Sequence, residues 1–176
     1  MASMVLVHGA WHGAWCWDGV VDHLDAAGID ATAVELPHAG FAADVAMARD
    51  VSNAADVGSV VIAHSYGGSV ITEATAGMTD LNRLVYLAAF MTDTGVDMVD
   101  VLGGHDAPLL GAVGFDDGQV TLDSGRTREL LYADSDNEAA AAATARLREM
   151  IEWPTDHSPF LTHPHQITNL LASYLS

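Results

Sequence analysis

The sequence predicts an α/β fold in which helices flank a mostly parallel sheet. Short apolar runs rich in β-branched residues recur along the first half of the chain, separated by stretches in which apolar residues have helical spacing. The runs do not alternate apolar with polar residues, as expected of strands buried on both faces of a parallel sheet. Strands that alternate with helices form βαβ units, whose active sites lie at the carboxyl ends of the strands.

The elements follow in order along the chain. We expect strands at residues 4–7, 31–36, 57–63 and 84–90. Helices are expected at residues 17–27, 41–55 and 67–76, and the first and third of them end at a glycine. Regular patterns are lost from about residue 91 to 136, which indicates a cap over the sheet. A helix at 137–150 with Asn137 as its N-cap, a last strand at 149–153 and a terminal helix from 163 complete the prediction.

A chain of 176 residues is long enough for one domain with a hydrophobic core. We expect residues 1–92 and 149–176 to form this core. Residues 93–148 are expected to form the cap and the helix that connects it to the last strand. Active-site chemistry is therefore sought in the loops after residues 8, 63 and 90.

The chain is strongly acidic, with 24 Asp and Glu residues, 6 basic residues that are all Arg, and a formal net charge of −18. This charge repels nucleic acid and anionic membranes, so neither is an expected partner. The acidic residues are scattered, which indicates a solvated surface; high-salt adaptation and a genomic bias are both open as its origin. Cys16 alone excludes an internal disulfide. Without a signal-peptide pattern or a membrane-length apolar run, the sequence predicts a soluble cytoplasmic protein.

The strongest chemical signal is Ala63-His64-Ser65-Tyr66-Gly67, where a buried strand meets a helix. A nucleophile on a tight strand-to-helix turn needs small residues two positions before and after it, because the backbones crowd there. The first of these is usually Gly and is Ala63 here, which such a turn tolerates. The helix N-terminus after Ser65 favours negative charge on its hydroxyl. A serine that only caps the helix is the alternative.

His8-Gly9-Ala10, at the end of the first strand, indicates a second part of the same site. Acyl transfer requires a stabilised oxyanion, and backbone N–H groups stabilise it best when they are already held in place. We expect the N–H groups of Ala10 and Tyr66 to be the two donors. An ordinary turn after the strand is the alternative.

His157, in Asp156-His157-Ser158-Pro159, is the expected general base. A serine hydroxyl is a poor nucleophile at neutral pH and needs such a base. The hydrolase fold places this histidine after the serine, late in the chain. The remaining histidines without a partner pattern are His12, His23, His38, His105, His163 and His165. The last two have no third ligand at a fitting spacing, so we expect no metal.

Together, residues 5–17, 63–68, 84–90 and 156–160 resemble, in the same order, the plant methylesterase and hydroxynitrile lyase group of α/β-hydrolases and its bacterial relatives. The resemblance covers residues 3–92 and 149–176 well, and residues 93–148 weakly as the cap of that group. It implies the α/β-hydrolase fold. It also implies a Ser-His-Asp hydrolase without a cofactor, whose small, mostly apolar pocket lies under the cap.

Two positions favour an esterase over a lyase within this group. The lyases carry a Thr after the first-strand His and a Lys after the catalytic His, whereas this chain has Gly9 and Ser158. A lyase needs a cation near the leaving cyanide, and Ser158 does not supply one. Cyanide release from mandelonitrile would reveal the lyase alternative.

The resemblance fails between Arg148 and Ile151, where the cap helix runs directly into the last strand. The group has another strand and helix there, and the loop after that strand holds the acid of the triad. Asp93, just after the fourth strand, is the best substitute acid within this chain. An acid in a segment that this sequence lacks is the other explanation. Asp156 adjoins His157, and adjacent side chains rarely orient toward each other.

We therefore expect a serine carboxylesterase that acts on small esters. Ser65 attacks the ester carbonyl, and His157 takes the proton and returns it to the leaving alcohol. The expected pocket residues are Gly9, Trp11 and His64, with Trp15 nearby. A deletion variant with a relic triad and a ligand pocket is the non-catalytic alternative, and slow turnover with preserved ligand binding would favour it. A small-molecule ester is the expected partner, and a homodimer is left open.

Overall fold

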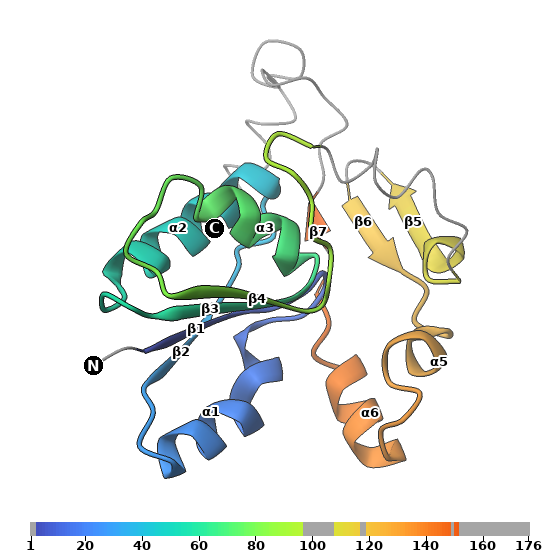
Figure 1. Cartoon of the computed structure of the whole chain (residues 1–176). Coiled ribbons are helices and arrows are strands. Elements are labelled where there is room, and N and C mark those ends of the chain that lie inside the picture. The colour runs from blue at the N-terminus through green and yellow to red at the C-terminus, as the bar shows by residue number, and fades with distance from the viewer. Residues whose placement is uncertain (1–2, 97–107, 117–118, 149, 152–176) are drawn as a thin grey trace, which may run out of the picture.

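The computed structural model describes residues 3–96, 108–116, 119–148 and 150–151. These residues form two lobes, of which the first comprises residues 3–96 and the second comprises the described residues from 108 to 151 (Figure 1). The terminal helix that the sequence predicts from residue 163, and His105, His157, His163 and His165, lie outside the described residues. The domain boundaries drawn from the sequence therefore remain a prediction.

The first lobe contains a parallel sheet with the strand order β2-β1-β3-β4. Its strands are β1 (Met4–Val7), β2 (Ala31–Val34), β3 (Val60–Ser65) and β4 (Arg83–Ala89). The inner strands β1 and β3 bury most of their apolar residues, as their uninterrupted apolar runs predict. The carboxyl ends of β1, β3 and β4 reach the edge of the sheet that faces the second lobe (Figure 1).

Helices cover both faces of this sheet (Figure 1). On one face lie α2 (Phe41–Ala54) and α3 (Gly67–Ala74), and on the other lies α1 (Asp18–Ala26), preceded by the 3-10 turn η1 (Ala14–Trp17). Gly28 and Gly77, after α1 and α3, have φ angles of +73° and +83°, which glycine adopts without strain. The glycine stops read from the sequence are therefore confirmed.

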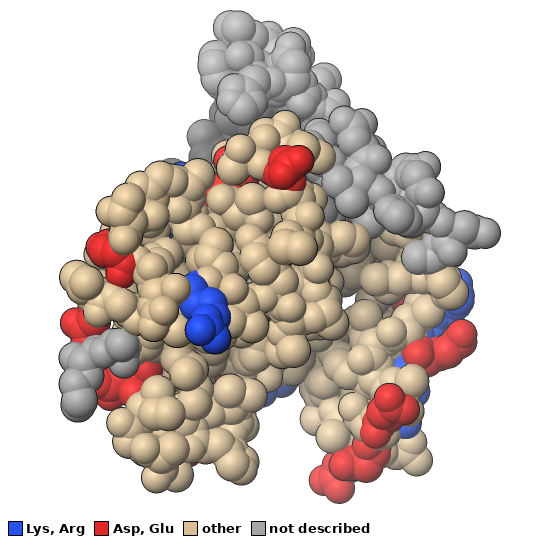
Figure 2. All heavy atoms as spheres, viewed as in Figure 1, with Lys and Arg blue, Asp and Glu red and all other residues tan. Residues whose placement is uncertain are grey.

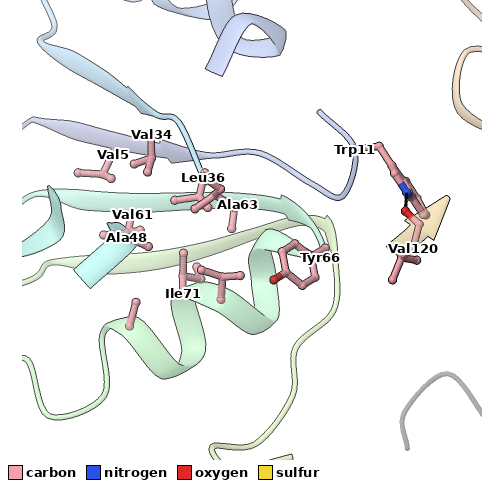
Figure 3. Packing of buried hydrophobic residues seen from close by; sticks show 13 residues of the cluster. Val5, Trp11, Val34, Leu36, Ala48, Val61, Ala63, Tyr66, Ile71 and Val120 are labelled. Atoms are coloured by element: carbon pink, nitrogen blue, oxygen red, sulfur yellow. Dashed lines mark hydrogen bonds between the residues drawn. The ribbon is translucent and has the colours of Figure 1, made fainter. Parts of the chain in front are cut away.

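The hydrophobic core lies between the sheet and the helices α2 and α3 (Figure 3). Val61 of β3 and Ile71 of α3 are completely buried, together with Ala48 of α2. Burial of a Val or Ile side chain contributes roughly 1.5–3 kcal/mol to stability. This core fixes α3 against β3, and thereby fixes the turn that joins them.

The second lobe contains a helix and a strand near its end, where the sequence predicts them, and further regular structure between residues 110 and 131, where the sequence predicts none. An antiparallel sheet is formed by β5 (Val113–Asp116), β6 (Gln119–Leu122) and β7 (Met150–Ile151), with the helices η2 (Leu110–Ala112), α5 (Thr127–Leu131) and α6 (Asn137–Thr144). The elements that were not predicted, η2, β5, β6 and α5, have three to five residues and are too short to show a period in the sequence. The strand expected at 149–153 is found at Met150–Ile151, but it pairs with β6 and not with the parallel sheet.

Two further expectations need correction. Asn137 is not the N-cap of α6, because Asp136 has the extended conformation of a cap and its Oδ1 accepts a hydrogen bond of 2.8 Å from the Ala139 N–H. The third strand starts at Val60 rather than at residue 57, because Val57 lies in the preceding turn with 78% of its surface exposed.

The surface matches the scattered acidity of the sequence. Figure 2 shows acidic side chains on both lobes and few basic ones on the visible face. Three arginines of the described chain take part in ion pairs, namely Arg126 with Glu129, Arg146 with Asp18 and Arg148 with Glu35. No helix within the described ranges is long and apolar enough to cross a membrane.

Candidate active site

Ser65 lies at the tip of β3, in a turn that leads directly into α3. Its φ angle is +52°, in the left-handed region that non-glycine residues rarely adopt. This conformation costs roughly 1–2 kcal/mol, so the surrounding structure must hold it in place. The Ser65 carbonyl accepts a hydrogen bond of 3.1 Å from the Phe90 N–H, and the register between β3 and β4 shifts at this point. The strained turn and the half-buried position of the serine are features of a nucleophile elbow.

The glycines after Ser65 allow the backbone to pack closely. A Cβ on Gly67 would lie 2.5 Å from the carbonyl oxygen of His8, and a Cβ on Gly68 would overlap the carbonyl oxygen of Phe90. Ala63, two residues before Ser65, is completely buried. The crowding that the sequence predicts around the elbow is therefore present on both sides of the serine.

The loop after β1 lies directly against the nucleophile. A Cβ on Gly9 would lie 2.9 Å from the Ser65 Cβ and 3.0 Å from the His64 Nδ1. The peptide group that joins Gly9 to Ala10 is thus next to the serine side chain. Among the described residues, none accepts a hydrogen bond from the Ala10 N–H.

Every carbonyl of residues 9–13 in this loop accepts a hydrogen bond. The donors are His8 Nδ1 to Gly9 O (2.8 Å), His12 Nδ1 to Ala10 O (2.8 Å), Arg148 N to Trp11 O (2.7 Å), His38 Nε2 to His12 O (2.9 Å) and Cys16 N to Gly13 O (3.1 Å). Three of these five donors are histidine rings. The loop therefore has a fixed path, along which the Ala10 N–H donates to no acceptor in the described part of the chain.

The neutral form of His8 follows from its partners and its burial. Its Nε2 accepts a hydrogen bond of 3.0 Å from the Leu36 N–H, so the ring proton is on Nδ1, which donates to Gly9. Burial lowers the pKa of His8 to about 4, and burial also lowers the pKa of His12 and of His64. These rings therefore act near neutral pH as uncharged donors and acceptors.

The residue after the nucleophile is held by a buried carboxylate. Asp44 of α2 is completely buried, and its Oδ2 accepts a hydrogen bond of 2.8 Å from the Tyr66 phenol. Its Oδ1 accepts a hydrogen bond of 2.8 Å from the His38 N–H, and the His38 Nδ1 lies 3.7 Å from Oδ2. His38 has a φ angle of +54°. The same histidine therefore links the Asp44 carboxylate to the loop after β1.

The second lobe docks on the loop after β1. The Trp11 Nε1–H donates a hydrogen bond of 3.0 Å to the Val120 carbonyl of β6 (Figure 3). The Tyr132 hydroxyl lies 2.9 Å from the His12 Nε2. Arg148 donates to the His12 carbonyl at 3.1 Å and pairs with Glu35 at 2.5 Å. The loop thus has partners in both lobes.

The structure brings together Ser65, Tyr66, Gly9, Ala10 and His64 of the predicted site. Trp11 is buried and lines a cavity of about 170 Å³ with residues of the second lobe, and Ser65 does not line this cavity. Asp93 is exposed in the turn after β4, and its carboxylate makes no hydrogen bond or ion pair with any described residue. His157 lies outside the described residues, so the base and the acid remain predictions.

Sequence reasoning missed the residues that support the site, namely His12, His38, Asp44, Tyr132 and Arg148. His12 lies three residues after Gly9 in the same loop, and His38 lies in the loop after β2. These positions give only a weak local signal in the sequence. Tyr132 and Arg148 act across 120 and 136 residues of sequence, so no local pattern points to them. In the described part of the chain, no three His, Cys, Asp or Glu side chains are arranged to hold a metal.

Comparison with known proteins gives one family and a consistent fold. The profile of the alpha/beta hydrolase family matches residues 4–168. A pFDCC methylesterase of Arabidopsis thaliana is 37% identical over 105 residues, which are 52% of this chain and 40% of that protein. A pheophorbidase of Raphanus sativus is 41% identical over 109 residues, which are 54% of this chain and 41% of that protein. The chain thus spans less than half the length of these relatives.

A solved structure extends the likeness of fold beyond these segments. Tomato methylketone synthase I in complex with 2-tridecanone superposes with a TM-score of 0.73 at 23% identity, over 85% of this chain and 67% of that chain. At this identity the likeness shows the fold. The predicted fold class, with a parallel sheet and flanking helices, is confirmed.

Proposed function

The chain belongs to the alpha/beta hydrolase family, and on that premise we propose that it is a serine carboxylesterase that hydrolyses small esters through an acyl-enzyme on Ser65. The observation that carries this proposal is the contact between the strained Ser65 turn and Gly9, next to the Ala10 N–H, which donates to none of the described residues. Relatives named as methylesterases support an ester as substrate. The alcohol that leaves is then a small one.

In the proposed reaction the Ser65 Oγ attacks the ester carbonyl while His157 takes the hydroxyl proton. The carbonyl oxygen becomes an oxyanion, which the N–H groups of Ala10 and Tyr66 stabilise. Collapse of this intermediate breaks the bond to the alcohol oxygen, and the proton on His157 passes to the leaving alcohol. Water then attacks the acyl-enzyme by the same steps and releases the acid.

Preorganisation of the loop after β1 is the main physical support for this mechanism. An oxyanion hole works when its donors do not have to reorient during the reaction. The five hydrogen-bonded carbonyls of the loop fix its backbone before any substrate arrives. The thiol of Cys16 is a poor competing nucleophile, because burial raises its pKa to about 12.

The test is intact-mass spectrometry before and after exposure to a fluorophosphonate probe, with p-nitrophenyl acetate turnover measured in parallel. We expect one probe per chain in the wild type and none in Ser65→Ala. Ser124→Ala removes an exposed serine of the second lobe and should be labelled like the wild type. Absence of labelling in a folded wild-type chain would exclude the esterase and favour the relic triad. Cyanide release from mandelonitrile would instead favour a lyase.

A further inference from the structure

We propose that Tyr132 of the second lobe is a positioning residue for the oxyanion donor Ala10, because its phenol orients the His12 ring that holds the Ala10 carbonyl. This inference rests on the proposed esterase function. The Tyr132 hydroxyl lies 2.9 Å from the His12 Nε2, and the His12 Nδ1 lies 2.8 Å from the Ala10 oxygen. The three groups form one continuous chain of hydrogen bonds from the second lobe to the loop beside Ser65.

The chemistry of a neutral imidazole explains how the phenol acts. A neutral ring carries one N–H, and the partner of each nitrogen decides which of the two holds the proton. When the Tyr132 hydroxyl donates to Nε2, the proton of His12 must be on Nδ1, where it donates to the Ala10 carbonyl. With the proton on Nε2 instead, the Nδ1 lone pair would face the carbonyl oxygen and repel it.

The surroundings of His12 restrict its ring to this orientation. The ring stacks on Trp15, with ring centres 5.5 Å apart and an angle of 25° between the planes. It meets the Tyr132 ring edge-on at 6.0 Å and the His64 ring edge-on at 6.1 Å. The Arg146 guanidinium lies over the Trp15 ring of this stack, 4.6 Å from the ring centre.

Tyr132 is itself fixed within the second lobe. It follows α5, and the Arg128 guanidinium donates hydrogen bonds to the Tyr132 carbonyl and, at 2.7 Å, to the Ser135 carbonyl. Its side chain therefore couples the position of the second lobe to the conformation of the loop after β1. Docking of the second lobe and readiness of the Ala10 N–H become one event.

The experiment compares Tyr132→Phe with Tyr86→Phe. Tyr86, on β4, has its hydroxyl 2.9 Å from the Thr72 hydroxyl, away from the loop after β1. We expect Tyr132→Phe to lower kcat for p-nitrophenyl acetate by about three- to tenfold, because the Ala10 N–H that stabilises the transition state is held less well once His12 loses its partner. KM should stay within about twofold for the same reason. Tyr86→Phe should leave both constants unchanged.

A second variant shows whether Tyr132 acts through His12. In His12→Asn the side-chain amide can still donate to the Ala10 carbonyl. Because an amide has no tautomers, it does not need the Tyr132 hydroxyl to place its proton. Addition of Tyr132→Phe to His12→Asn should therefore change kcat no further, whereas two independent residues would show additive losses. Equal kcat in Tyr132→Phe and Tyr86→Phe, or additive losses in the double variant, would overturn the proposal.

Nitrogen NMR of the imidazole rings gives a readout that does not depend on activity. We expect the Nδ1–H tautomer of His12 in the wild type and in Tyr86→Phe, and a gain of the Nε2–H tautomer in Tyr132→Phe. An unchanged tautomer in Tyr132→Phe would overturn the inference while the esterase function stands. A wild-type chain that shows the expected tautomer but no probe labelling would instead overturn the proposed function, and with it the role of Tyr132 in catalysis.

Discussion

The Tyr66 phenol donates a hydrogen bond of 2.8 Å to the Asp44 carboxylate, which ties the residue after the nucleophile to the first turn of α2. Both side chains are buried, and Asp44 is completely buried. The N–H of Tyr66 is one of the two proposed oxyanion donors, so the bond orients the residue that carries it.

Tyr66→Phe tests how much this hydrogen bond contributes to the free energy of unfolding. Without the phenol, the buried Asp44 carboxylate loses one of its donors, and such a loss costs about 1–3 kcal/mol of the free energy of unfolding. Urea unfolding of Tyr66→Phe and Tyr86→Phe should show the larger loss in Tyr66→Phe, because the partner of Tyr86 is the uncharged, half-buried Thr72 hydroxyl. Equal losses in the two variants would contradict the assigned role of Asp44.

The variants Ser65→Gly and Ser65→Ala should separate the effect of backbone strain on stability from the effect of the lost hydroxyl on reactivity. Both variants lose the hydroxyl and should lose probe labelling completely. Only glycine adopts a φ angle of +52° without strain, so Ser65→Gly should be more stable than Ser65→Ala by roughly 1 kcal/mol. Thermal and urea unfolding measure the difference. Equal stability would mean that the turn relaxes once the serine is removed.

Gly9→Ala should reduce activity without a change in any chemical group. The new Cβ would lie 2.9 Å from the Ser65 Cβ and must push the loop or the serine aside. A displacement of about 1 Å in an active site can cost roughly a hundredfold in rate. Gly19→Ala, in α1 with nothing within 4 Å of the new Cβ, is the matched control. It should keep full activity and gain up to about 1 kcal/mol of stability, since Ala favours helix.

Acid should destabilise the fold through His8. The pKa of His8 falls from 6.5 to about 4 on burial. Above pH 6.5 the His8 ring is neutral in both the folded and the unfolded chain, so its titration does not reduce the free energy of unfolding there. As the pH falls from 6.5 to about 4, only the unfolded chain gains the proton, and about 3 kcal/mol of stability is lost.

Urea unfolding at several pH values between 7 and 4 measures this loss. His8→Gln should reduce the pH dependence in that window, since glutamine does not titrate, and the part that remains is expected from His12 and His64, whose pKa burial also lowers. His23→Gln, at an exposed position of α1, should keep the slope of the wild type. The same slope in all three proteins would show that His8 is not the group responsible.

The first lobe could be predicted because each of its elements has a local signal. Uninterrupted apolar runs predict β1 and β3, and Gly28 and Gly77 end their helices as expected. Ser65 could be predicted because strand, serine and helix adjoin in sequence. In the second lobe only α6 and the position of β7 could be predicted, since elements as short as β5 and β6 leave no period to read.

The supporting residues of the site were beyond prediction for a different reason. His12 and His38 have no metal-like or triad-like spacing, and their roles arise from burial and from carbonyl partners. Tyr132 and Arg148 reach the loop only through the packing of the second lobe. Hydrogen bonds between residues so far apart follow from tertiary structure, which a single sequence does not reveal by its periodicity.

The distant partners of the loop after β1 also have a consequence for the order of folding. Contacts across 120 and 136 residues require the closure of long chain segments, which is slow compared with the formation of α1, α2 and α3. During refolding from urea, helical circular dichroism should therefore return before Ser65 regains its reactivity toward the probe. The reactivity of Ser65 is then expected to depend on the last long-range contacts to form, which places the proposed chemistry at the end of folding.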